Sequence, residues 1–459
     1  SRERFSLLLP NLKNYMVKDK LMISVYLRSL GCAKNQVDSE LMCGVLKKEE
    51  FQIVDDPSQA EVIIVNTCGF IESAKAESIE NILDLAQYKE QGKCRLLLAV
   101  GCMAEKYADE MAESMPELDA LMGVGHYEDI ADLIKKQLGI QSARMEIADN
   151  VYLERDYSQL GATAYLKIAE GCDNNCSFCL IPQLRGPYKS RPMEDIIEEA
   201  ESLWRQGIKE IILLAQNTTY YGIDIYGKCQ LPDLLRKLAD IPFAMIRLLY
   251  AYPEGIDDEL IQAMKDHGNI CHYLDMPIQH SVDHILADMN RPDTHDGILY
   301  KIAMLREAMP DITLRTTVMV GFPGESDSDF QQLLDFLQEA CFDWVGAFPY
   351  YQEEDTLAAT MPHQVDGETK QERLDILMDC TAKITEKRLQ RYIGSSLPVL
   401  VCESAAELYG DGWWAGRSQY QTPEVDGMIY FLANNAAIGD IINVRITDSD
   451  IYDLMGEQA

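Results

Sequence analysis

Long apolar runs and positive charge are both scarce in this 459-residue chain. No uninterrupted apolar run approaches the roughly 20 residues needed to span a bilayer, which argues against a membrane protein. The chain does not open on a charged and then apolar leader, so we expect it in the cytoplasm. Lysine and arginine number 41 against 75 aspartate and glutamate residues, a net charge of −34. Such a surface repels nucleic-acid phosphate and attracts basic partners.

Length and pattern predict several domains. Residues 1–21 fit no clear element and are read as an extension or a tag remnant. Alternating strands and helices over 22–145 predict a three-layer α/β domain with a parallel sheet, followed by a polar linker at 146–160. Six strand candidates in 161–392, separated by mostly helical stretches, predict a closed or partial (βα) barrel of the TIM type. The short, turn-rich strands of 393–459 predict a small antiparallel β-barrel.

Three cysteines cluster in "GCDNNCSFCLIP", directly after the first strand candidate of the barrel: Cys172, Cys176 and Cys179. A structural zinc site normally has four Cys or His ligands, and the nearest histidines, His126 and His272, are remote in sequence. A four-iron cluster can be held by three cysteines, which leaves one iron open to a small molecule. The run therefore favours such a cluster over zinc.

Three further cysteines stand in similar contexts, each after a strand candidate and beside a glycine. They are Cys32 in "LGCAKN", Cys68 in "NTCGF" and Cys102 in "VGCMA". Parallel strand ends lie side by side at one sheet edge, so we expect these thiols to converge into a second three-thiolate site. The alternative is three buried apolar cysteines. The other seven are read as structural: Cys43, Cys94, Cys229, Cys271, Cys341, Cys380 and Cys402.

Polar residues and glycines also follow several barrel strands. At this edge of a (βα) barrel they are candidates for a ligand pocket, although a polar loop would use the same residue types. The candidates are Gln216 and Asn217 in "AQNTTYYG", Gln279 in "DMPIQH", and Gly321, Gly324 and Glu325 in "VGFPGE".

The motifs together resemble those of the radical S-adenosylmethionine (SAM) methylthiotransferases. "SLGCAKNQVDSE", "NTCGFI", "GCMAEKY", "EGCDNNCSFCLIP", "MNRPDT" and "VGFPGE" carry the resemblance, which covers nearly all of the chain after residue 20. Within the family, "SLGCAKNQVDSE" and "RLLYAYP" look most like the branch that modifies ribosomal protein S-twelve. Asn217 departs from the family pattern, which has Asp there; an amide keeps the acceptor but loses the charge.

The resemblance implies an amino-terminal methylthiotransferase domain, a radical-SAM barrel and a carboxy-terminal TRAM domain. It implies one 4Fe-4S cluster that binds SAM and an auxiliary 4Fe-4S cluster that handles sulfur. The first would be held by Cys172, Cys176 and Cys179, and the second by Cys32, Cys68 and Cys102. The strand-end polar residues would form the SAM pocket. We also expect an electron donor such as flavodoxin, a sulfur donor and a monomeric enzyme.

The expected reaction adds a methylthio group to the β-carbon of an aspartate in S-twelve, a basic protein. The alternative substrate is a tRNA adenosine, which requires a basic TRAM domain. Residues 395–459 hold two basic residues, Arg417 and Arg445, against ten acidic ones, a balance of −8 that disfavours RNA binding. A non-catalytic iron–sulfur electron carrier would explain two clusters but not two open coordination sites.

Overall fold

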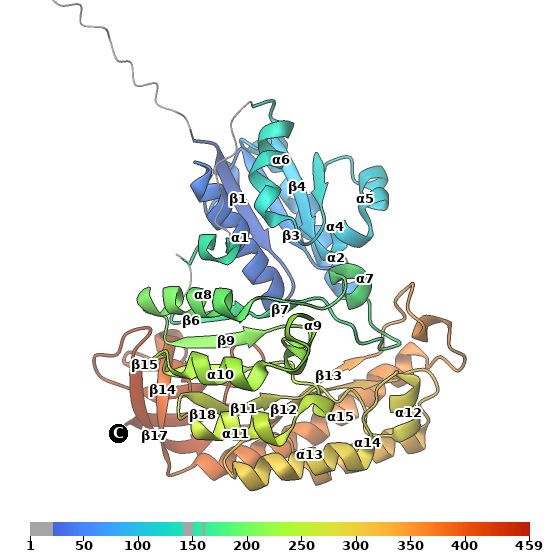
Figure 1. The fold of residues 1–459 in the computed structure, drawn as a ribbon, viewed down its shortest axis with the longest axis vertical. Coiled ribbons are helices and arrows are strands. Elements are labelled where there is room, and N and C mark those ends of the chain that lie inside the picture. Colours follow the sequence, from blue (N-terminus) through green and yellow to red (C-terminus); the bar gives the residue numbers. More distant parts are fainter. Residues whose placement is uncertain (1–21, 141–149, 158–160) are drawn as a thin grey trace, which may run out of the picture.

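The computed structural model describes residues 22–140, 150–157 and 161–459. The proposed extension at 1–21 lies outside these residues, as does most of the stretch from 141 to 160. No helix among the described residues is long and apolar enough to cross a membrane. Figure 1 shows three parts: an amino-terminal α/β part, a central part, and a carboxy-terminal β part packed beside the centre.

The amino-terminal part is a parallel sheet between helices, as predicted. Its order within the described residues is β2-β1-β3-β4-β5. Side chains of β3 and β4 alternate between two apolar clusters, one with α1 and α6 and the other with α2 and α5. The elements are β1 (Ser24–Ser29), α1 (Ala33–Lys48), β2 (Gln52–Ile53), η1 (Pro57–Gln59), β3 (Val62–Thr67), α2 (Glu72–Ala86), α3 (Tyr88–Gln91), β4 (Leu96–Gly101), α4 (Cys102–Lys106), α5 (Ala108–Ser114), β5 (Ala120–Met122), η2 (Tyr127–Asp129) and α6 (Ile130–Gln137).

The central part is an open, six-stranded parallel sheet in the described chain, so the partial form of the barrel is the observed one. The order β13-β12-β11-β10-β9-β6 has β13 and β6 at opposite edges. The strands are β6 (Thr163–Lys167), β9 (Glu210–Leu214), β10 (Met245–Leu248), β11 (Ile270–Asp275), β12 (Thr313–Val320) and β13 (Trp344–Pro349). All six match strands predicted from the sequence.

Helices connect most of these strands and cover the outside of the sheet (Figure 1). Their starts follow capping rules: Asp257 caps α11 and a Ser326–Asp329 capping box starts α14. The helical elements are η3 (Val151–Glu154), α7 (Ile181–Arg185), α8 (Met193–Arg205), η4 (Thr218–Tyr220), α9 (Ile223–Tyr226), α10 (Leu231–Ala239), η5 (Pro253–Gly255), α11 (Asp258–Asp266), α12 (Asp283–Asp288), α13 (His295–Ala308), α14 (Asp327–Ala340), η6 (Ala358–Thr360), α15 (Gly367–Leu389) and η7 (Gln390–Tyr392).

The carboxy-terminal part is a closed barrel in the order β14-β15-β16-β18-β17. The predicted small antiparallel β-barrel is confirmed, with four of its five strand pairings antiparallel and one, β16 with β18, parallel. The closing strand β18 was missed, since "LMGEQ" shows little strand pattern. The elements are β14 (Ser396–Ser404), α16 (Ala406–Tyr409), β15 (Trp413–Arg417), β16 (Ile429–Leu432), β17 (Ile441–Ser449) and β18 (Leu454–Gln458).

Buried ion pairs join this barrel to the central sheet. Glu210 at the start of β9 accepts from both Arg247 and Arg417, at 2.9 and 2.7 Å. Tyr273 donates to Asp426 across the same boundary at 2.7 Å. Because these charged and polar groups are buried and hydrogen-bonded to one another, they fix the barrel against the amino ends of the central strands.

Candidate metal centres and active site

Three of the predicted cysteines lie at one edge of the amino-terminal sheet. β1, β3 and β4 are hydrogen-bonded neighbours, and Cys32, Cys68 and Cys102 follow their carboxyl ends. Cys32 caps α1 and Cys102 begins α4. A Cβ added to Gly31 would lie 3.1 Å from the Cys68 Sγ, so the turn that carries Cys32 packs against Cys68. We call this set the strand-end cysteines.

The strand-end thiols affect one another electrostatically. Burial raises the pKa of Cys68 to about 11, and negative charge on Cys32 and Cys102 raises it further. Burial also raises the pKa of Cys102, while the guanidinium of Arg185 lowers it. A bound metal centre would favour the thiolate forms of Cys68 and Cys102, because its positive charge opposes these effects.

The other predicted cysteines lie in a loop after β6, closed at its base by a two-stranded antiparallel pair, β7 (Ala169–Glu170) and β8 (Lys189–Ser190). Gly171 has a φ of 78°, and a Cβ there would lie 2.1 Å from a backbone oxygen, so only glycine fits. Within the loop, Cys179 N–H donates to the Cys176 carbonyl at 3.1 Å. We call Cys172, Cys176 and Cys179 the loop cysteines.

The loop cysteines show the same electrostatic pattern. Burial raises the pKa of Cys179 to about 12, and charge on Cys176 and Cys172 adds to the effect. Among the described residues, no three Cys, His, Asp or Glu side chains are close enough to hold a single metal ion. The thiolates of a four-iron cube each bind a different iron, so three thiols that hold a cluster need not converge on one metal ion.

Arg185 links the two cysteine groups. It ends α7, the helix that follows the loop cysteines, and its Nε donates to the Cys102 Sγ at 3.3 Å. The same buried guanidinium donates to Asn35 and to Asp38, at 2.5 and 2.8 Å. Asp38 also pairs with Lys167 at 2.5 Å. This network ties α1 to the barrel, and Figure 1 shows α7 between the two parts.

A tyrosine and an arginine flank the loop cysteines from the barrel. The Tyr252 hydroxyl lies 3.6 Å from the Cys176 Sγ, and burial together with the charge on Cys176 raises the pKa of that phenol. Arg291 stacks over the Tyr252 ring at 4.3 Å and pairs with Asp293. Both side chains therefore help to cover Cys176, which is buried.

Two of the six predicted pocket residues carry unused acceptors. The Oε1 atoms of Gln216 and Gln279 are buried and accept no hydrogen bond from the described residues. The amide nitrogen of Gln216 donates to Glu170. Buried acceptors without partners are rare in folded proteins and are typical of ligand contacts.

The other four pocket residues have structural roles in the described chain. The Asn217 Oδ1 accepts from the Thr219 hydroxyl at 2.7 Å. Glu325 accepts from the Gly321 N–H at 3.0 Å and from Arg373 at 2.7 Å, so its carboxylate holds its own loop together. Gly321 and Gly324 have φ values of 70° and 86° and shape that turn.

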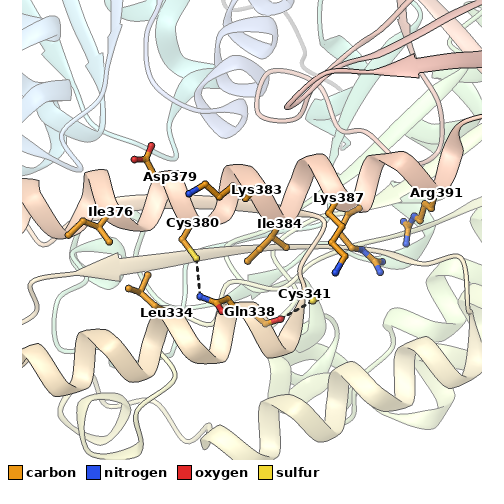
Figure 2. Close-up of a pocket in the computed structure, with 11 residues that line it drawn as sticks. Leu334, Gln338, Cys341, Ile376, Asp379, Cys380, Lys383, Ile384, Lys387 and Arg391 are labelled. Carbon is orange, nitrogen blue, oxygen red and sulfur yellow. Dashed lines mark hydrogen bonds between the residues drawn. The ribbon is translucent and has the colours of Figure 1, made fainter.

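A hollow of about 970 Å³ lies elsewhere, on the outer face between α14 and α15 (Figure 2). Cys341 and Cys380 line it and hydrogen-bond with Gln338, and Cys380 also packs against the central apolar core. None of the predicted site residues lines this hollow.

Sequence reasoning missed Arg185, and also Lys34 and Tyr250, whose side chains meet between the domains. Each lies in or beside a quoted motif, "CLIPQLRG", "CAKN" or "RLLYAYP". For the two cations, the available signal was a positive charge close to a cysteine motif, two residues after Cys32 for Lys34 and six after Cys179 for Arg185.

Three family matches follow the three parts of the fold. The uncharacterized protein family UPF0004 matches residues 24–123, the radical SAM superfamily 166–337 and the TRAM domain 393–458. A curated relative in Clostridioides difficile, named ribosomal protein uS12 methylthiotransferase RimO, is 46% identical over 95% of this chain and 99% of its own length. The relative of that name in Geobacter sulfurreducens is 48% identical over 94% and 97%. The chain belongs to the RimO family.

Membership makes the chain a radical SAM methylthiotransferase and implies a 4Fe-4S cluster and SAM as cofactors. Solved structures support the fold. The radical SAM methyltransferase TsrM of Kitasatospora setae matches with a TM-score of 0.53 at 14% identity, over 72% of this chain and 75% of that one. The cobalamin-dependent SAM radical enzyme OxsB matches with a TM-score of 0.50 at 14% identity, over 80% and 56%. At such identity the likeness concerns the fold alone.

Proposed function

We propose that this chain adds a methylthio group to the β-carbon of an aspartate in ribosomal protein uS12. The observation that carries the proposal is the 46% identity, over nearly the full length of both chains, to relatives named for modifying that protein. In the reaction a C–H bond of the aspartate is replaced by a C–S bond to a methylthio group. A ribosomal substrate would place the reaction in the cytoplasm.

Two clusters would serve this reaction. The SAM-binding 4Fe-4S cluster would be held by the loop cysteines and an auxiliary 4Fe-4S cluster by the strand-end cysteines. When bound, the clusters and SAM supply a 5′-deoxyadenosyl radical and sulfur. The convergence of three strand-end thiols beside a buried guanidinium supports the second cluster. Gln216 and Gln279, with their unused acceptors, are the best supported of the SAM contacts.

Charge supports a protein substrate over tRNA. Residues 395–459 are all described, and Arg445 is the only exposed basic side chain among them. Arg417, the other basic residue, is buried against Glu210 at 2.7 Å. A TRAM surface with one exposed cation provides little positive charge to bind the phosphates of an RNA backbone. We further propose an electron donor such as flavodoxin, a sulfur donor and a monomeric enzyme.

Mass spectrometry of uS12 tests the proposal. In cells without this protein, uS12 should lack the mass of one methylthio group, and the wild-type chain should restore it. Cys102→Ala should fail to restore it, whereas Cys94→Ala, a buried cysteine outside both groups, should succeed. An unchanged uS12 mass in the deletion strain would contradict the proposal.

A second assay concerns the loop cysteines alone. Reconstituted protein incubated with SAM and a reductant should form 5′-deoxyadenosine, and Cys176→Ala should not. Absence of this product from wild-type protein with full iron content would contradict the assignment of the loop cysteines.

A further inference from the structure

A lysine ammonium lies against a tyrosine ring between the amino-terminal domain and the barrel. Lys34, in the first turn of α1, is only 8% exposed, and its Nζ lies 3.4 Å from the centre of the Tyr250 ring. Tyr250 has a φ of 58°, a conformation that residues other than glycine seldom adopt. The two residues come from "SLGCAKNQVDSE" and "RLLYAYP", the stretches most typical of the ribosomal-protein branch.

The ammonium of Lys34 has no counter-charge in contact with it. It makes no hydrogen bond or ion pair with any residue that the structure describes. Charge on Cys32, Glu170 and Asp275 acts on it without direct contact, and the two carboxylates are already paired with Lys167 and Arg315. Burying a cation without a counter-charge is costly, and contact with an aromatic face offsets only part of that cost. Such an arrangement is retained where a ligand completes it.

The contact also adjoins both cysteine groups along the chain. Lys34 follows Cys32 by two residues along the chain. Its ring partner is Tyr250. Two residues further along the chain is Tyr252, whose hydroxyl lies 3.6 Å from the Cys176 Sγ. An anion bound at Lys34 would therefore be close to both groups.

We propose that Lys34, held in place by Tyr250, binds the side-chain carboxylate of the aspartate that is modified. This inference rests on the proposed function and names the contact that selects its substrate. Aspartate is ionised at neutral pH and supplies the missing negative charge. Its β-carbon is bonded directly to the carboxylate carbon, so fixing the carboxylate on Lys34 holds the reacting carbon between the cysteine groups. An adenosine has no carboxylate and would leave the lysine unpaired, which disfavours it as a substrate.

The test compares two uS12 peptides on the reconstituted holoenzyme, one with the target aspartate and one with asparagine at that position. Binding is measured by fluorescence anisotropy and modification by mass spectrometry. Wild type should bind the aspartate peptide about tenfold or more tightly than the asparagine peptide. Lys34→Met should reduce this ratio to about one by weakening only the aspartate peptide, and Lys34→Arg should preserve most of it.

Lys135→Met provides the control. Lys135 is a partly buried lysine of the same domain, it lies near the aromatic ring of Phe51, and it is remote in sequence from the cysteines. It should keep the wild-type ratio. Equal binding of the asparagine peptide by wild type and Lys34→Met shows that the variant is folded. A preserved aspartate preference in Lys34→Met would overturn the inference alone. A wild-type enzyme that modifies no uS12 peptide would overturn the proposed function and this inference together.

Discussion

The Arg185 side chain contacts both a strand-end cysteine, Cys102, and a carboxylate that holds the domains together, Asp38. Removing its charge would leave Asp38 with one partner and Cys102 with none of its stabilising charge. We expect Arg185→Gln to lower the free energy of unfolding by about 3 kcal/mol, the usual cost of breaking a buried ion pair. Urea denaturation of the iron-free protein measures this.

The matched control is Arg205→Gln, at an arginine whose side chain is 60% exposed and pairs with Glu201 on the same helix. It should change the free energy of unfolding by less than about 0.5 kcal/mol. After reconstitution, Arg185→Gln should also bind less iron than Arg205→Gln. Indistinguishable variants would show that Arg185 does not support the strand-end site.

Site residues that are recognisable by their type and spacing could be predicted from the sequence. Residues whose role depends on a partner far away along the chain could not. The strand-end cysteines follow apolar strands beside glycines, so their placement at one sheet edge followed from the sequence. Arg185 meets Asn35, which lies 150 positions away, and no local pattern encodes that contact. Glu325 and Asn217 stay predicted ligand contacts, and the hydrogen bonds they accept from Arg373 and Thr219 could not be read from the sequence.

At the level of secondary-structure elements, the strand-end cysteines are placed by turns, and the turn before Cys32 contains a glycine in the left-handed conformation. Gly31 has a φ of 87°, and a Cβ there would lie 2.9 Å from the Cys68 Cβ. Gly207 has a φ of 94° with nothing within 4 Å of such a Cβ. Alanine costs about 1–2 kcal/mol of backbone strain at either position. Only Gly31→Ala also pushes Cys68 away from Cys32.

We therefore expect Gly31→Ala to lose most of the auxiliary iron while Gly207→Ala retains it. The measurement is iron per chain after reconstitution, in a background where the loop cysteines are replaced by alanine. Both variants should lose a similar amount of stability from backbone strain. Equal iron contents would mean that the close approach of Gly31 to Cys68 is not needed for the site.

The contact between the TRAM barrel and the central sheet should make stability depend on pH. The Asp426 side chain is fully buried, and this burial raises its pKa to about 6 although Arg315 lies 3.5 Å away and Tyr273 donates to it. A carboxyl whose pKa rises on folding stabilises most below its ordinary pKa near 4, and this contribution is lost as the pH rises through about 6.

Asp426→Asn removes that titration and keeps the shape. The wild-type free energy of unfolding, relative to that of Asp426→Asn, should fall by about 1 kcal/mol between pH 5 and pH 7, since one pKa unit corresponds to about 1.4 kcal/mol. Urea denaturation at several pH values measures the difference. A difference that is constant or grows with pH would contradict the raised pKa of Asp426.

Over the whole molecule, the order and class of the parts could be predicted because apolar periodicity separates parallel α/β from small β-rich segments. Local pattern did not reveal that β18 enters the final barrel parallel to β16. The direction of a strand in a closed barrel depends on the path of the connection that leads into it, and this path is a property of the assembled fold.

The TRAM barrel also presents a face suited to a basic protein. Tyr409 stacks on Trp413 and on Tyr430, with ring centres 5.0 and 5.2 Å apart. Exposed acids surround this aromatic cluster, including Glu403 and Asp411. Aromatic rings beside carboxylates bind lysine and arginine side chains, and such charge complementarity acts mainly on encounter and specificity.

We expect the triple variant Glu403→Lys, Glu407→Lys and Asp411→Lys to raise the KM for uS12 about tenfold while kcat stays near wild type, because the acids act on docking and not on the reacting carbon. The control reverses three exposed acids on α15, Glu368, Glu372 and Asp375, which gives the same net charge on another surface. Its KM should stay within about twofold of wild type at moderate ionic strength. If both triple variants raise KM equally, net charge and not the TRAM face governs docking; if neither does, uS12 binds elsewhere on the enzyme.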